Sequence, residues 1–165
     1  MSALTKNETS GVALAPRERQ VLEGLADGRT LPEVANSLRL RDGTATGYLK
    51  LAKRRLGASE NPAALAHAYA NGSITRPEQR DPEDLFLPVE QRELIPLIAQ
   101  GLRATQIAAR TKRPVAVVRR DARELMAALG AKNPAHVVTQ AWAYQLLTEE
   151  QVRSWMTPPE EDQGS

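Results

Sequence analysis

Two clusters of Lys and Arg in the sequence could bind anions. One lies in residues 39–55 and the other in residues 110–123, and each sets six cations against one carboxylate. The cations are Arg39, Arg41, Lys50, Lys53, Arg54 and Arg55 in the first cluster, and Arg110, Lys112, Arg113, Arg119, Arg120 and Arg123 in the second. Ammonium and guanidinium groups bind phosphate oxygens, and arginine can also bind guanine through two hydrogen bonds. The clusters therefore predict a surface that binds a polyanion.

The two clusters occupy equivalent places in an internal repeat. A shift of 73 residues lays residues 14–75 over residues 87–148 without a gap, and 11 of the 62 pairs are identical. Many other pairs exchange one apolar residue for another, as Val21 and Leu94 do, which keeps apolar residues at helical spacing. We therefore expect an all-α protein made of two tandem copies of one small four-helix domain.

Short segments of different composition bound the expected domains. Both repeats are basic, whereas the segments after each of them are acidic. Each domain is close to the lower size limit for independent folding, so we expect two marginal cores. We predict a flexible arm at 1–13, the first domain at 14–75, a stiff charged linker at 76–86, the second domain at 87–148, and a short helix with an acidic disordered tail at 149–165.

Helix signals recur in the same order in both copies. The expected helices run from Pro16 to a cap at Gly28, then over 31–38, 44–56 and 62–70 in the first copy, and over 88–100, 104–110, 115–129 and 134–147 in the second. Pro96 falls inside the helix expected at 88–100, where proline removes a backbone hydrogen bond and clashes with the preceding turn. We expect a kink there, or a helix that starts later.

Several classes of function lack the residues they need. Cysteine is absent, which removes disulfides and thiolate metal sites. His67 and His136 are not equivalent in the repeat and have no carboxylate at metal-ligand spacing. The sequence has no Gly-rich phosphate loop, nucleophile signature, signal peptide or 18-residue apolar run. We therefore expect a cytoplasmic protein without catalytic residues, metal, cofactor or membrane partner.

A short helix, a turn and a second helix with outward cations form a helix-turn-helix arrangement. The motifs Leu14-Ala-Pro-Arg-Glu-Arg-Gln-Val-Leu, Leu25-Ala-Asp-Gly, Glu33-Val-Ala, Asp42-Gly-Thr and Arg54-Arg-Leu-Gly resemble the LuxR-type (GerE-type) DNA-binding domain. The second copy resembles it less closely, through Leu87-Pro-Val-Glu-Gln-Arg-Glu-Leu, Ile98-Ala-Gln-Gly-Leu, Gln106-Ile-Ala and Leu129-Gly-Ala. The resemblance implies that the third helix reads the major groove of double-stranded DNA and that the fourth often forms a dimer contact.

The resemblance also implies which residues contact DNA. The base-facing positions fall at Thr46, Gly47 and Lys50 in the first copy and at Arg119, Arg120 and Arg123 in the second. Further candidates are Thr44, Lys53, Arg54, Arg55, Lys112 and Arg113. Arginine can discriminate guanine, whereas glycine has no side chain. We therefore expect the second copy to contribute more sequence specificity and the first more phosphate affinity.

These observations favour a bacterial transcriptional regulator that binds DNA with two helix-turn-helix units. The alternative is an interaction module of the same fold that contacts RNA polymerase, a sigma factor or another regulator, which the weaker second copy and the acidic tail favour.

The sequence is compatible with two arrangements of the helix-turn-helix units. It is also compatible with either a monomer or a homodimer. The linker spans up to about 40 Å and could bridge half-sites about 34 Å apart. Alternatively, the fourth helices dock into a compact pseudo-dimer, in which Tyr69 and Trp142 are core or interface residues. Trp155 either contacts a partner or belongs to a helix that caps the second copy.

Overall fold

The computed structural model describes residues 12–156, and this part of the chain is all-α. The helices are α2 (Pro16–Ala26), α3 (Leu31–Ser37), α4 (Asp42–Leu56), α5 (Asn61–Asn71), the 3-10 helix η1 (Pro82–Asp84), α6 (Val89–Arg92), α7 (Leu94–Ala99), α8 (Ala104–Thr111), α9 (Val115–Leu129), α10 (Pro134–Ala143) and α11 (Glu149–Met156). None of them is long and apolar enough to cross a membrane. Most of the expected arm and the tail after residue 156 lie outside the described residues.

The helix bounds repeat with the offset of 73 residues found in the sequence. Helices α4 and α9 begin and end at equivalent positions, as do the starts of α3 and α8 and of α5 and α10. Left-handed φ angles also occur in equivalent pairs: Gly28 and Gly101 (88° and 90°), Arg39 and Lys112 (both 59°), Gly57 and Gly130 (72° and 68°), and Gly72 and Gln145 (75° and 62°). We call α2–α5 the N-terminal group and α6–α10 the C-terminal group.

Capping residues mark the start of α3 and the ends of α4 and α9. Thr30 and Glu33 form a reciprocal cap at the start of α3, because the Glu33 backbone N–H donates to Thr30 Oγ1 (3.3 Å) and the Thr30 N–H donates to Glu33 Oε1 (2.9 Å). Gly57 and Gly130 end α4 and α9 in the left-handed conformation, which glycine adopts without a Cβ clash.

Three expected helices differ from the observed ones by more than one residue at an end. The helix expected at 88–100 is interrupted at Glu93, and α7, the helix that contains Pro96, begins only at Leu94. This later start is one of the two outcomes that we expected. Helix α4 starts at Asp42 rather than Thr44. The Asp42 carboxylate lies in the first turn, where the helix dipole favours negative charge. Helix α10 ends at Ala143 rather than residue 147, because the chain turns at Gln145 with a left-handed φ of 62°.

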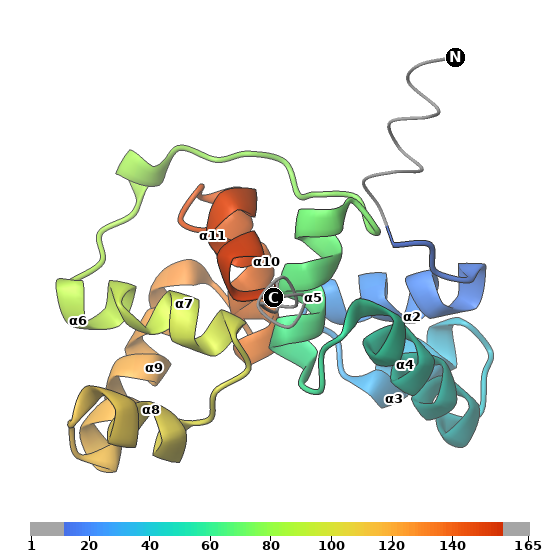
Figure 1. The fold of residues 1–165 in the computed structure, drawn as a ribbon, viewed down its shortest axis with the longest axis horizontal. Helices are drawn as coiled ribbons and strands as arrows, with labels where there is room; N and C mark the ends of the chain where they lie inside the picture. The colour runs from blue at the N-terminus through green and yellow to red at the C-terminus, as the bar shows by residue number, and fades with distance from the viewer. Residues whose placement is uncertain (1–11, 157–165) are drawn as a thin grey trace, which may run out of the picture.

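One continuous core joins the two groups, in place of the two separate cores that we expected. Its buried residues come from both groups and from the segments that connect them. Helices α5 and α10 pack together at the centre of the molecule, with the N-terminal group on one side and the C-terminal group on the other (Figure 1). The Tyr69 and Trp142 rings are both buried with centroids 5.7 Å apart, and the Tyr69 hydroxyl lies 2.9 Å from Thr139 Oγ1. The last helices of the two groups, α5 and α10, are thus docked against each other, as in the compact of the two arrangements that the sequence left open.

The two groups are related by an approximate two-fold axis. Helix α10 packs against α2, and α5 packs reciprocally against α7. A Cβ atom on Gly28 would lie 2.6 Å from His136 Nδ1, and one on the equivalent Gly101 would lie 3.4 Å from Ala63 Cβ, where Ala63 is the equivalent of His136. Reciprocal contacts of this kind are the signature of two-fold symmetry. The contact between the equivalent residues Tyr69 and Trp142 places the axis close to these rings.

The segment that we expected to act as a free linker is held against the C-terminal group. The Arg80 N–H donates to the Ala143 carbonyl (2.7 Å), and the Gln145 side-chain amide donates to the Arg80 carbonyl (3.1 Å). The Arg80 guanidinium also lies 4.7 Å from the centroid of the Tyr144 ring. The segment therefore does not extend between two separated units.

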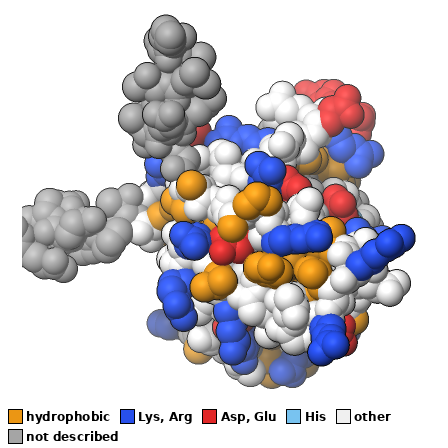
Figure 2. All heavy atoms as spheres, turned by 90° about the vertical axis from the view of Figure 1, so that its right-hand side faces the viewer, with side chains coloured by type: hydrophobic (Ala, Val, Ile, Leu, Met, Phe, Trp, Pro, Cys, Tyr) orange, Lys and Arg blue, Asp and Glu red, His pale blue; other side chains and the backbone are white. Residues whose placement is uncertain are grey.

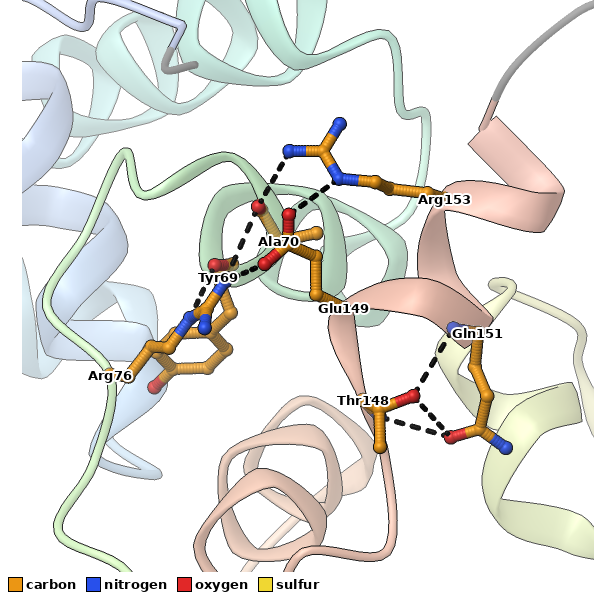
Figure 3. A network of polar contacts seen from close by, with 7 residues as sticks. All are labelled: Tyr69, Ala70, Arg76, Thr148, Glu149, Gln151 and Arg153. Atoms are coloured by element: carbon orange, nitrogen blue, oxygen red, sulfur yellow. Dashed lines mark hydrogen bonds and ion pairs between the residues drawn. The ribbon is translucent and has the colours of Figure 1, made fainter. Parts of the chain in front are cut away.

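Helix α11 closes the molecule by packing on α5, so it covers the N-terminal group rather than capping the second copy. Glu149 accepts from Arg76 (3.1 Å) and from Arg153 (2.7 Å). These two arginines also donate to carbonyls at the end of α5, Arg76 to Tyr69 (2.8 Å) and Arg153 to Ala70 (3.2 Å) (Figure 3). We call Arg76, Glu149 and Arg153 the α11 clasp.

Candidate nucleic-acid interface

Helices α3 and α4 form a helix-turn-helix whose second helix has one face in solvent. The turn between them contains Arg39 in the left-handed conformation, and α4 packs on α2 and α3. The inward residues Ala45, Leu49, Ala52 and Leu56 are buried. Because these residues recur at helical spacing, the residues between them face outward.

The outward face of α4 carries most of the candidates predicted in the first copy. Thr46, Lys50 and Arg54 are exposed at intervals of four residues and form one stripe along the helix. Thr44 is also exposed, Gly47 and Lys53 are partly buried, and a Cβ atom on Gly47 would meet nothing within 4 Å. Figure 2 views the side of the molecule that carries this helix, and Lys and Arg side chains predominate over Asp and Glu on it.

Arg55 differs from the other cations of α4 because it has an internal partner. Its Nε lies 3.0 Å from Glu18 Oε1, and the Glu18 side chain is only 2% exposed. The same carboxylate oxygen accepts the Ala15 backbone N–H at 3.0 Å, at the start of α2. Arg55 therefore ties the end of α4 to the start of α2, a structural role that our assignment to DNA contact missed.

Helices α8 and α9 repeat this arrangement in the C-terminal group. Val118, Leu125 and Leu129 are buried on the inner face of α9. Arg119 and Arg123 are exposed one turn apart on its outer face. These two residues therefore point into solvent with the spacing that suits a groove-reading helix.

Three further candidates of this group have different surroundings. Arg113 is only 19% exposed and pairs with Glu93 (2.8 Å) and with the buried Asp121 (3.5 Å). Arg120 is 58% exposed and also contacts Asp121, at 3.4 Å. Lys112 is exposed in the turn between α8 and α9. Arg113 thus has mainly a structural role, because it neutralises the buried carboxylate of Asp121.

The cations lie at different ends of the two outward helices. Lys53, Arg54 and Arg55 belong to the last turn of α4, and their equivalents in α9 are Met126, Ala127 and Ala128. Conversely, the N-terminal half of α9 has Arg119 and Arg120 where α4 has Thr46 and Gly47. The two helices consequently present different chemistry at the same position.

The last helix of each group, α5 or α10, holds the end of the outward helix through an equivalent contact. His67 Nδ1 lies 2.8 Å from the Leu56 carbonyl in the N-terminal group. In the C-terminal group, Gln140 Nε2 donates to the Leu129 carbonyl at 2.7 Å. Sequence reasoning missed this pair, although His67 and Gln140 are separated by the repeat offset of 73 residues. These contacts fix the outward helices relative to the central pair α5 and α10.

Two titratable groups lie at the contact between the two helix groups, the buried Tyr69 and the half-buried His136. Burial raises the pKa of Tyr69 to about 12, so the hydroxyl stays protonated. Burial and the nearby Lys132 lower the pKa of His136, against the opposing effect of Asp27. The neutral ring fits the geometry, because His136 Nδ1 accepts the Lys132 backbone N–H at 3.1 Å.

The comparisons with known proteins agree with the geometry of the N-terminal group. Residues 12–68 match the model of the GerE family, described as bacterial regulatory proteins of the luxR family. This range covers α2, α3, α4 and most of α5, and it contains one helix-turn-helix domain of the GerE/LuxR type. No curated protein and no solved structure gives a significant match.

Proposed function

We propose that this chain is a sequence-directed double-stranded DNA-binding regulator of transcription that uses α4 and α9 as two recognition helices. The GerE-type domain at residues 12–68 supports DNA binding by α4. The observation that carries the second half of the proposal is the exposed pair Arg119 and Arg123 on α9, a helix whose bounds are equivalent to those of α4. The chain then acts as a pseudo-dimer, with both readers in one polypeptide.

The approximate two-fold relation supports a particular orientation of the DNA site. Two-fold-related recognition helices match half-sites of opposite orientation, because the duplex backbone has two-fold symmetry of its own. The half-sites differ in sequence, since α4 presents Thr46 and Lys50 where α9 presents Arg119 and Arg123. The proposed target is therefore an inverted pair of dissimilar half-sites.

Helices α9 and α4 make different contributions to DNA binding. Arg119 and Arg123 contact guanine edges in the major groove, where a good bidentate pair contributes about 1–3 kcal/mol of discrimination. Lys53 and Arg54 of α4 add phosphate contacts, which position the protein without reading sequence. If about six phosphates are neutralised, the binding constant falls with salt at a log-log slope near −5.

The test compares one arginine from each helix on two DNA sequences. Arg119→Ala should weaken binding to the preferred site by roughly 5- to 150-fold and weaken binding to a scrambled duplex much less. Arg54→Ala is the matched control, because Arg54 is also exposed, and it should weaken binding to both sequences by similar factors. Fluorescence anisotropy at fixed salt measures both. Equal losses on both sequences for Arg119→Ala would contradict the assignment of base reading to α9.

A further inference from the structure

A cleft of about 310 Å³ separates α7, α8 and α9 from the start of α5. Apolar side chains make most of its lining, among them Pro62, Ile98, Leu102, Ala104, Ile107 and Ala122. The size lies at the lower end of the range of about 300–1,000 Å³ that is typical of small-molecule sites. Such sites are often found where two structural units meet, as the two helix groups do here. We call this space the apolar cleft.

The two-fold relation gives the apolar cleft a counterpart with different chemistry. The counterpart, of about 410 Å³, lies between α4 and the start of α10 and includes Leu31, Leu49 and the charged Lys53. Ala104 and Ala122 stand in the apolar cleft where the counterpart has Leu31 and Leu49. The counterpart is the larger space despite its leucines, but Arg29, Lys53 and Glu60 line it. The apolar cleft is therefore distinguished by the apolar character of its wall rather than by its size.

The charges around the apolar cleft define what it can accept. Among the described residues, Glu60 and Arg103 are the charged ones that line it, and they pair with each other at 3.3 Å. Because these two charges compensate, this lining offers a charged ligand no net attraction, and a ligand charge would lose its hydration on entry. The occupant that fits is uncharged and compact, and it gains free energy by burying apolar surface.

An occupant of the apolar cleft would lie directly behind the recognition surface of the C-terminal group. Val118 and Ala122 line the cleft from α9, and Arg119 and Arg123, the next residues along the chain, are exposed. Pro62 and Glu60 line it from the other helix group. We propose that the apolar cleft is a binding site for a small, uncharged, apolar molecule, which contacts both α9 and the start of α5.

The test uses N-phenyl-1-naphthylamine, an uncharged probe whose fluorescence rises in apolar surroundings, with the full-length protein and no DNA. The result is therefore independent of the proposed function. The wild type should bind the probe saturably at one site. The double variant Ala104→Leu/Ala122→Leu adds bulk to two side chains that line the cleft, so it should bind the probe at least about tenfold more weakly, or about 1.4 kcal/mol.

The matched control is Ala109→Leu/Ala127→Leu, which adds the same atoms to exposed positions of the same two helices and should bind the probe like the wild type. Ala122→Val should give an intermediate loss, and it decides the question if the double leucine variant does not fold. Circular dichroism reports folding for each variant.

Three results would overturn the proposal. The first is unchanged probe affinity in the folded double leucine variant, which would locate the probe elsewhere. The second is binding only after residues 157–165 are removed, which would make the chain's own tail the occupant. The third is loss of probe binding as protein concentration rises and the chain self-associates, which would make a second copy the occupant.

Discussion

Arg54 and Arg55 are neighbours in the sequence, yet the structure gives them different roles. Arg54 is exposed on the outward face of α4. Arg55 turns back to Glu18, whose carboxylate is buried beneath it at 3.0 Å. The sequence placed both in a basic cluster but could not separate them, because Glu18 lies 37 residues earlier in the chain and only the packing of α2 on α4 brings it near.

We expect Arg55→Ala to lower the free energy of unfolding by about 1–3 kcal/mol, because it leaves a buried carboxylate with one fewer donor. Arg54→Ala is the control and should change stability by less than about 0.5 kcal/mol, as surface substitutions usually do. Urea unfolding monitored by circular dichroism measures both. Equal stability of the two variants would show that the Glu18 contact does not stabilise the fold.

The elements that sequence reasoning predicted well are those with strong local signals. The bounds of α9 and the glycines that end α4 and α9 follow from apolar spacing and from the left-handed preference of glycine. The end of α10 was missed because it depends on Gln145, a residue with no local preference for its left-handed φ of 62°. Likewise, the packing of α11 on α5 depends on residues far apart in the sequence, Arg76 and Glu149.

The α11 clasp should make the stability of the protein depend on pH. Hydrogen bonds from Arg153 and Arg76 lower the pKa of Glu149 below the ordinary value of 4.5. A carboxyl group with a lowered folded pKa stabilises the fold above its unfolded pKa, and this contribution is lost as the pH falls through the folded pKa.

We therefore expect Glu149→Gln to be less stable than the wild type at pH 7, by less than about 1 kcal/mol because the side chain is 44% exposed. The difference should close as the pH falls below about 4.5. Thermal unfolding of both proteins across this pH range measures it, with Glu150→Gln as the control on the neighbouring exposed residue. A difference that stays constant with pH would contradict a role for the ionised carboxylate.

At the scale of the whole molecule, the repeat predicted the order of helices but not their joint core. Equivalent residues such as Tyr69 and Trp142 were expected in a core or interface, and they meet across the approximate two-fold axis. The sequence left open whether the two halves are separated by the linker or docked, because the contacts that decide it cross between the repeats. Burial of residues from both groups in one core favours the docked arrangement.

A joint core should make the two groups unfold together. We expect a single cooperative transition on heating, with the calorimetric and van't Hoff enthalpies in agreement. Differential scanning calorimetry measures this, and Trp142→Ala should shift the whole transition to lower temperature, because it removes the ring that packs against Tyr69. Two separate transitions in the wild type would mean that the groups fold independently.

The most direct test of the central claim is selection of bound fragments from a random duplex library by the intact protein at physiological salt, followed by sequencing. Two recognition helices in one two-fold pseudo-dimer predict enrichment of two dissimilar half-sites, in inverted orientation and at one fixed spacing. Enrichment of a single half-site would contradict the claim that both α4 and α9 read sequence. No enrichment above non-specific binding would contradict the DNA-binding account and favour a protein partner, with the exposed Phe86 (84%) and Val89 (63%) as its first candidate contacts.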